Sequence, residues 1–187
     1  MNLLSHRVIL LAGVFATSLV LAESPSAPAG FSTGPAIQGY GPVSDIPDPD
    51  FSLPTDRKYR VVFDVARTPD DPAELNRRIE TVARFMNMHV RAGVKPENLE
   101  LALVIHGAAG KDMLKHAAYE DQFLVENPNL ELLDRLKSAG VGIFLCGQTA
   151  AARGWSRKDL AESVSLATSA MTVLVDYQSR GYSLIAF

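Results

Sequence analysis

From residue 59 to the C-terminus, short apolar runs alternate with segments whose apolar residues recur every three or four positions. In residues 73–91, one helical stripe is formed by Leu75, Ile79, Val82, Met86 and Val90. The same spacing predicts helices over 111–123, 130–139 and 169–180, and a helical turn over 148–153. The apolar runs predict strands over 59–65, 99–106, 141–145, 164–167 and 182–187.

The predicted strands are almost continuously apolar, as in YRVVFDV (59–65) and VGIFL (141–145). Strands of this kind are buried on both faces, which is typical of parallel sheets. Because strands and helices alternate, the helices serve as right-handed crossovers that cover the sheet. We therefore predict, for residues 59–187, an α/β domain that is a three-layer α/β/α sandwich with a five-stranded parallel sheet.

Residues 1–22 have the pattern of a secretory signal. His6 and Arg7 precede an apolar stretch that ends in Val20-Leu21-Ala22, with short residues at the −3 and −1 positions of a cleavage site. The stretch is about 14 residues long, shorter than the ~20 that a spanning helix needs. We expect cleavage after residue 22 and a periplasmic or otherwise exported protein with no membrane association. An uncleaved membrane anchor is the alternative.

Residues 23–58 precede the predicted domain and hold seven of the eleven prolines. Residues 24–30 resemble a flexible linker. The later part is more apolar, with Ile37, Tyr40, Val43, Ile46, Phe51 and Leu53. We interpret it as an extended arm that docks on the domain or on a neighbouring subunit, with a disordered tether as the alternative.

Composition and charge exclude several classes of function. Apolar residues make up 47% of the chain and charged residues 21%, which is ordinary for a globular protein. The net charge of −3, without a basic stripe, argues against nucleic-acid binding. Cys146 is the only cysteine, so an intrachain disulfide and a multi-cysteine zinc site are excluded. The four histidines lack a recognisable ligand spacing and no nucleotide-binding motif is present, so we predict no metal and no cofactor.

Candidate chemistry lies where the predicted strands end. Asp64, His106 and Cys146 lie at or near the ends of the first three strands, and ligands of open parallel sheets gather at such ends. Gly107 and Gly147 follow two of these strands and allow tight turns beside a substrate.

Cys146 is the candidate nucleophile, and it precedes a predicted helical start. The amides of Gly147, Gln148 and Thr149 are expected to stabilise a thiolate there. A free cysteine is also a common buried apolar residue, and that alternative stays open.

His106 is the second candidate catalytic residue, because it could orient or deprotonate the thiol. A strand-end histidine bonded to the backbone is the alternative. Lys111 is a candidate for attracting an anionic sulfur species, and a solvated lysine is the alternative reading.

The C-terminal segment carries a recognisable order of features. An apolar strand ends in Cys146, a short polar loop and the apolar segment 164–167 follow, and a helix ends in Gln178-Ser179-Arg180-Gly181-Tyr182. This order resembles the C-terminal half of the DsrE/DsrF-like family. The resemblance covers residues 59–187, and the arm sequence GYGPV (39–43) resembles the exported, single-domain branch.

The resemblance implies a five-stranded parallel sheet and homo- or hetero-oligomers, often trimers or hexamers. The best understood members relay sulfane sulfur as a cysteine persulfide inside the cell, and their sulfur-carrying cysteine maps onto Cys146. An exported chain departs from that pattern, and family membership alone supplies no reaction.

Three functions follow as hypotheses. The first is a sulfurtransferase-like sulfur relay through Cys146, with a sulfur donor or acceptor protein as partner. The second is a non-catalytic, oligomeric ligand- or partner-binding protein of the periplasm. The third is a thiol redox sensor, which would need an external or intersubunit thiol because the chain has no second cysteine.

Overall fold

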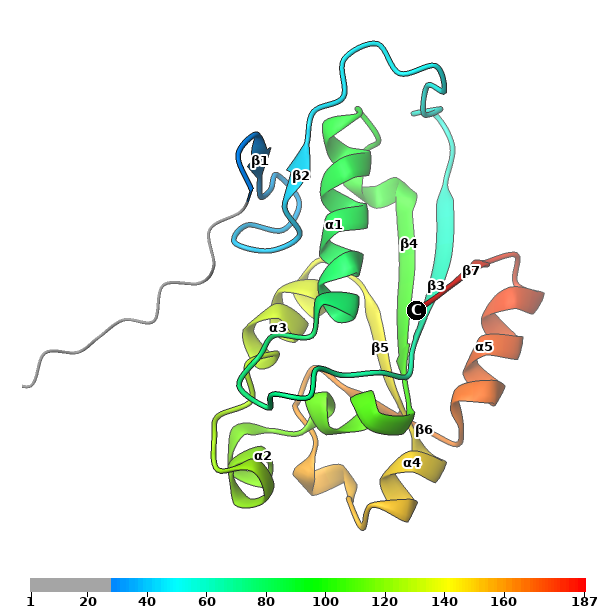
Figure 1. The fold of residues 1–187 in the computed structure, drawn as a ribbon. Helices are drawn as coiled ribbons and strands as arrows, with labels where there is room; N and C mark the ends of the chain where they lie inside the picture. The colour runs from blue at the N-terminus through cyan, green and yellow to red at the C-terminus, as the bar shows by residue number, and fades with distance from the viewer. Residues whose placement is uncertain (1–27) are drawn as a thin grey trace, which may run out of the picture.

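The computed structural model describes residues 28–187, so the predicted signal at 1–22 lies outside the described residues (Figure 1). The main sheet consists of β3 (Tyr59–Val65), β4 (Leu99–Ile105), β5 (Gly142–Cys146), β6 (Ser165–Ala167) and β7 (Ser183–Ala186). All neighbours in this sheet are parallel, and the order is β6-β5-β4-β3-β7. Within residues 28–187, no helix is both long and apolar enough to cross a membrane.

Helices cover the sheet on both faces (Figure 1). α1 (Arg77–Arg91) and α3 (Leu130–Ser138) pack on one face, and α5 (Ala170–Ser179) packs on the other. α2 (His116–Phe123) and α4 (Gly147–Ala152) lie near the carboxyl ends of the strands. The described residues also form three 3-10 helices: η1 (Pro96–Asn98), η2 (Gly107–Met113) and η3 (Arg157–Asp159). The predicted α/β/α sandwich with five parallel strands is confirmed.

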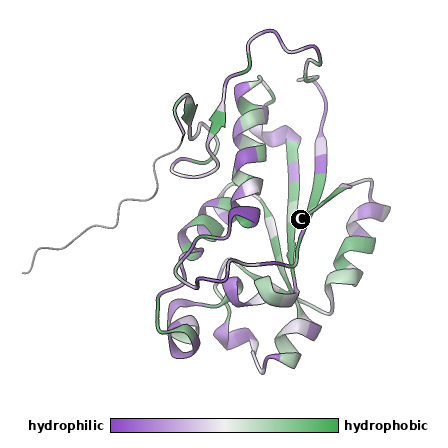
Figure 2. Ribbon diagram, viewed as in Figure 1, coloured by the Kyte–Doolittle hydropathy of each residue, from purple (hydrophilic) through white to green (hydrophobic). Residues whose placement is uncertain are grey.

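The hydrophobic core is divided by the sheet into two unequal parts. Alternate residues of the strands, such as Phe63, Leu103 and Leu145, join α1 and α3 in the larger cluster. The other set of alternate residues, Val62, Val104 and Phe144 among them, meets α5 in a smaller cluster that includes Cys146. Figure 2 shows the apolar strands between the helices. Cys146 therefore lies on the α5 face of the sheet.

Two helix boundaries differ from the prediction. The first helix begins at Arg77 instead of residue 73, because the Asn76 side chain accepts the Arg78 N–H and caps the helix there. The segment 111–123 is not one helix: η2 runs to Met113, and α2 begins at His116. The break follows from Leu114, which forms a β-bridge with Leu160 and therefore has extended backbone.

The arm is docked on the domain over residues 31–44, whereas Ile46 and Phe51, which were also expected to dock, are exposed at 70% and 77%. β1 (Phe31–Ser32) and β2 (Val43–Ser44) pair antiparallel beside α1. The buried Asn87 side chain accepts the Ile37 N–H at 2.8 Å and donates to the carbonyl oxygens of Tyr40 and Gly41. A Cβ at Gly41 would collide with the backbone of α1, so the arm approaches the helix as closely as glycine permits.

Candidate functional site at the strand ends

The sheet order brings the three predicted strand-end residues to one edge of the fold. β3, β4 and β5 are neighbours, and Val65, Ile105 and Leu145 lie level with one another in the register. The next residues on β4 and β5, His106 and Cys146, therefore end adjacent strands side by side. The sequence alone could not establish this neighbourhood.

Cys146 ends β5 and is the N-cap residue of α4, with 6% of its surface exposed. Burial raises the pKa of its thiol, but four nearby donors outweigh burial and lower the pKa below its ordinary value. The groups that lower the pKa are the amides of Ala170, Thr149 and Gln148 and the Thr149 hydroxyl, which lie near the sulfur, although Cys146 makes no capping hydrogen bond to α4. The environment thus favours a thiolate, the form that reacts as a nucleophile.

Gly147 and Gln148 join the start of α4 to the end of β6. A Cβ at Gly147 would collide with the Ala167 carbonyl oxygen, so only glycine lets the two segments approach this closely. The Gln148 side chain donates to the Thr168 carbonyl at 3.3 Å. Both residues help to fix the start of α4 against the segment that precedes α5.

His106 follows β4 in extended conformation, and its Nε2 lies 3.0 Å from Oδ1 of Asp64 on the neighbouring strand β3. Both side chains are partly exposed, at 32% for His106 and 22% for Asp64. The next residue, Gly107, has a φ of +58° and donates its N–H to the Thr149 hydroxyl at 3.1 Å. Thr149 thus links the turn after β4 to the cysteine at the end of β5.

Lys111 lies apart from these residues. Its Nζ donates to the Tyr119 hydroxyl at 3.1 Å and lies over the rings of Tyr119 and Phe123. Tyr119 and Phe123 belong to the larger core cluster, whereas Cys146 belongs to the cluster on the opposite face. The predicted role of Lys111 in attracting a substrate has no support from this position.

Two contributors to the site were not among the predicted site residues. Ala170 acts through its backbone amide, which no side-chain motif reveals. Asp64 was recognisable as a polar residue near a strand end, but its ion pair with His106 depends on β3 and β4 being neighbours. A buried carboxylate, Asp112 at the end of η2, was also not predicted; it accepts hydrogen bonds from Thr68 and Asn76.

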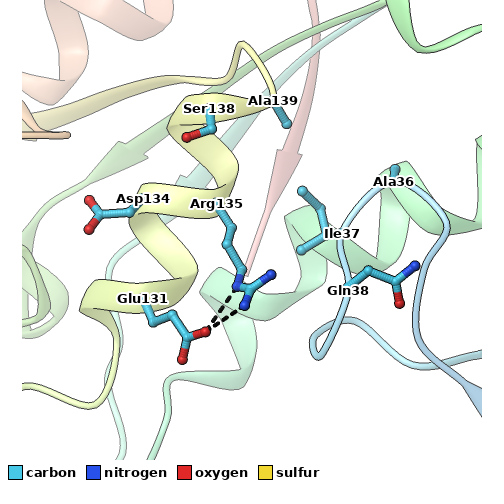
Figure 3. A pocket seen from close by; sticks show the side chains of 8 residues that line it. All are labelled: Ala36, Ile37, Gln38, Glu131, Asp134, Arg135, Ser138 and Ala139. Carbon is cyan, nitrogen blue, oxygen red and sulfur yellow. Dashed lines mark hydrogen bonds and ion pairs between the residues drawn. The ribbon is translucent and has the colours of Figure 1, made fainter.

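Two surface pockets of the described residues lie away from Cys146, which lines neither of them. One lies between the arm and α3, where Glu131 and Arg135 form an ion pair at 2.7 Å (Figure 3). The other lies beside α2 and α3. Within residues 28–187, no three His, Cys, Asp or Glu side chains are grouped as metal ligands.

Comparison with known proteins supplies a family and two similar folds. The sequence profile of the DsrE/DsrF-like family matches residues 60–187. MTH1491, a protein of unknown function from Methanobacterium thermoautotrophicum, is 20% identical, with a TM-score of 0.54 over 70% of this chain and 100% of its own. The ychN protein from E. coli is 19% identical, with a TM-score of 0.51 over 68% of this chain and 99% of its own. No curated protein matches the chain.

Proposed function

The chain belongs to the DsrE/DsrF-like family, and on that premise we propose that it carries sulfane sulfur as a persulfide on Cys146. One observation carries the proposal. The cysteine combines a lowered thiol pKa with a place at the carboxyl ends of the strands, where ligands of open parallel sheets bind. A cysteine that only filled core space would need no donors around its sulfur.

The chemistry is a nucleophilic displacement at sulfur. The Cys146 thiolate attacks the sulfane sulfur of a donor, and a new S–S bond forms at Sγ. The S–S bond of the donor breaks, and its electron pair leaves with the rest of the donor. The outer sulfur then leaves Cys146 by the same reaction in reverse, with an acceptor thiolate as the attacking group. A donor or acceptor protein is the partner that this role requires.

Intact mass spectrometry after exposure to polysulfide tests the proposal. We expect the wild type to gain sulfur, to lose it with dithiothreitol, and to gain none as Cys146→Ser. Because Cys146 is the only cysteine, this variant is a complete control. Equal sulfur gain by Cys146→Ser would overturn the proposal, and so would a wild type that gains none.

Export through residues 1–22 is part of the proposed role. The observation behind it is the charged start, the apolar stretch and the short residues at 20–22. Fractionation of cells that express the full chain tests it. We expect the protein in the exported fraction with its N-terminus at residue 23, and an intact Met1 in the cytosol would contradict export.

A second candidate function, assembly into a homo-oligomer that binds a ligand or partner, is favoured by α5. This helix is apolar on both sides: Val173, Leu174 and Tyr177 pack against the sheet, while Met171 and Val175 point outward with 73% and 67% exposure. Helices that are apolar all round are normally buried (Figure 2). We propose that a second copy covers this outer side, in a trimer or hexamer.

Sedimentation analysis of the wild type and of Met171→Ser/Val175→Ser tests the assembly. We expect an oligomer for the wild type and smaller species for the double variant. A monomeric wild type would contradict assembly, and an unchanged oligomer in the variant would place the interface elsewhere. Persulfide loading of the same samples shows whether assembly and sulfur transfer are separate functions.

A further inference from the structure

Three polar or reactive side chains lie near the ends of adjacent strands: His106 and Cys146 directly follow the paired residues Ile105 and Leu145, and Asp64 pairs with Val104, two residues before His106. All three point to the α5 face, because the residues two positions earlier on each strand all belong to the α5-face cluster. These residues are Val62, Val104 and Phe144. The backbones of neighbouring strands are about 4.8 Å apart, so His106 has Cys146 as its neighbour on β5 and contacts Asp64 on β3.

The position of the imidazole is set by Asp64. Nε2 of His106 lies 3.0 Å from Oδ1 without a hydrogen bond between them, and this oxygen is shielded from solvent with no hydrogen-bond partner among the described residues. A buried carboxylate oxygen is stabilised only by a group that brings a proton or a positive charge. The contact with Asp64 therefore orients the His106 ring.

The Cys146 sulfur does not depend on His106 for its thiolate form. The donors that act on it are the amides of Ala170, Thr149 and Gln148 and the Thr149 hydroxyl. The sequence suggested that His106 deprotonates the thiol, but the donors around the sulfur make that task unnecessary. An imidazole beside a nucleophile that is already activated can act instead on the group that leaves, by giving it a proton.

We propose that His106, positioned by Asp64, is the general acid for sulfur transfer from a thiol persulfide, R–S–S–H, to Cys146. This inference rests on the proposed persulfide function. The Cys146 thiolate attacks the terminal sulfur, the new Sγ–S bond forms, and the S–S bond of the donor breaks. Its electron pair goes to the R–S sulfur, which takes the proton of the imidazolium and leaves as R–S–H. Cys146 becomes a persulfide and His106 becomes neutral.

The leaving group identifies the donor class. An ordinary thiol has a pKa of about 8.5, so its thiolate is a poor leaving group near neutral pH and gains from a proton. Sulfite, which leaves from thiosulfate, departs without needing a proton. A general acid at this position therefore accelerates transfer from thiol persulfides and has little effect with thiosulfate.

The test compares loading rates with two donors, glutathione persulfide and thiosulfate, followed by intact mass. We expect His106→Ala and Asp64→Asn to load about 100-fold more slowly from the persulfide. The loss of rate with thiosulfate should be about ten-fold smaller than the loss with the persulfide. Free imidazole should restore persulfide loading to His106→Ala. Asp64→Glu, which keeps the carboxylate, should stay close to the wild type.

His116→Ala is the matched control, because this histidine is exposed on α2. Equal slowing with both donors, or no slowing with either, would overturn the general-acid role. Thiosulfate loading also reports whether each variant is folded. A wild type that loads from neither donor would instead overturn the proposed persulfide function, so the two failures are distinguishable.

Discussion

The Asp112 carboxyl is the most deeply buried acidic group described here, with 1% of its surface exposed. Thr68 donates to its Oδ1 at 2.9 Å and Asn76 to its Oδ2 at 2.7 Å. Burial raises its pKa from the ordinary 3.8 to about 6, although these two hydrogen bonds and the nearby Lys111 act in the opposite direction. Folding therefore favours the neutral form of Asp112.

The raised pKa sets the sign and size of a pH effect. The folded state binds the Asp112 proton more tightly than the unfolded state, so this stabilisation is complete below the ordinary pKa and is lost as pH rises through about 6. Each factor of ten in acidity is worth about 1.4 kcal/mol, so full ionisation removes about 3 kcal/mol of stability. Asp112→Asn removes the titration and can still bond both neighbours: its carbonyl accepts from Asn76, and its amide donates to the Thr68 oxygen.

Urea unfolding of the wild type and Asp112→Asn, from about pH 4 to about pH 8, measures this effect. We expect the free energy of unfolding of Asp112→Asn to rise by about 2 kcal/mol relative to the wild type over that range, because the unfolded carboxyl is already partly ionised at pH 4. Asp121→Asn removes an exposed carboxylate on α2 and should show no such trend. A difference between wild type and Asp112→Asn that stays constant within about 0.5 kcal/mol would refute the reasoning.

Three further predictions concern the arm and the cysteine. Asn87→Ala leaves buried backbone groups of the arm without partners. It should lower the free energy of unfolding by about 3 kcal/mol and speed proteolysis of the arm. An unchanged free energy of unfolding and an unchanged proteolysis rate would contradict the docking. Thr149→Val should raise the pKa of the Cys146 thiol and slow its alkylation near neutral pH. Thr149→Ser, which keeps the hydroxyl, should do neither. Equal alkylation rates in the two variants would exclude the hydroxyl as a donor. Gly147→Ala should destabilise the fold by about 1–3 kcal/mol, because its methyl group collides with the Ala167 carbonyl. An unchanged free energy of unfolding in urea would show instead that β6 can shift.

The fold was largely predictable because its evidence is local. Apolar runs and helical spacing depend on neighbouring positions along the chain, so all five strands of the main sheet were found near their observed bounds. The errors occur where a distant segment determines the structure. Leu114 is extended because it pairs with Leu160, and residues 73–75 stay outside α1 because Asn76 caps the helix at Arg77.

The sequence predicts the reactive residues of the site but not the backbone and side-chain groups that surround them. Cys146 and His106 were recognisable from their place at strand ends. The Ala170 amide reaches the sulfur only because β6 pairs with β5 and α5 begins just after it, and strand order cannot be read from periodicity. Asn87 is similar: an asparagine on a helix predicts exposure until the arm supplies buried backbone groups for it to bind.

The most direct test of sulfur carriage is to measure how much sulfur Cys146 gives up. The protein is loaded with polysulfide, desalted and treated with cyanide, and the thiocyanate formed is counted against the intact mass. The account predicts one thiocyanate for each loaded chain, return of the mass to that of the free thiol, and none from Cys146→Ser. A load that cyanide cannot remove from the wild type, or an equal yield from Cys146→Ser, would contradict it.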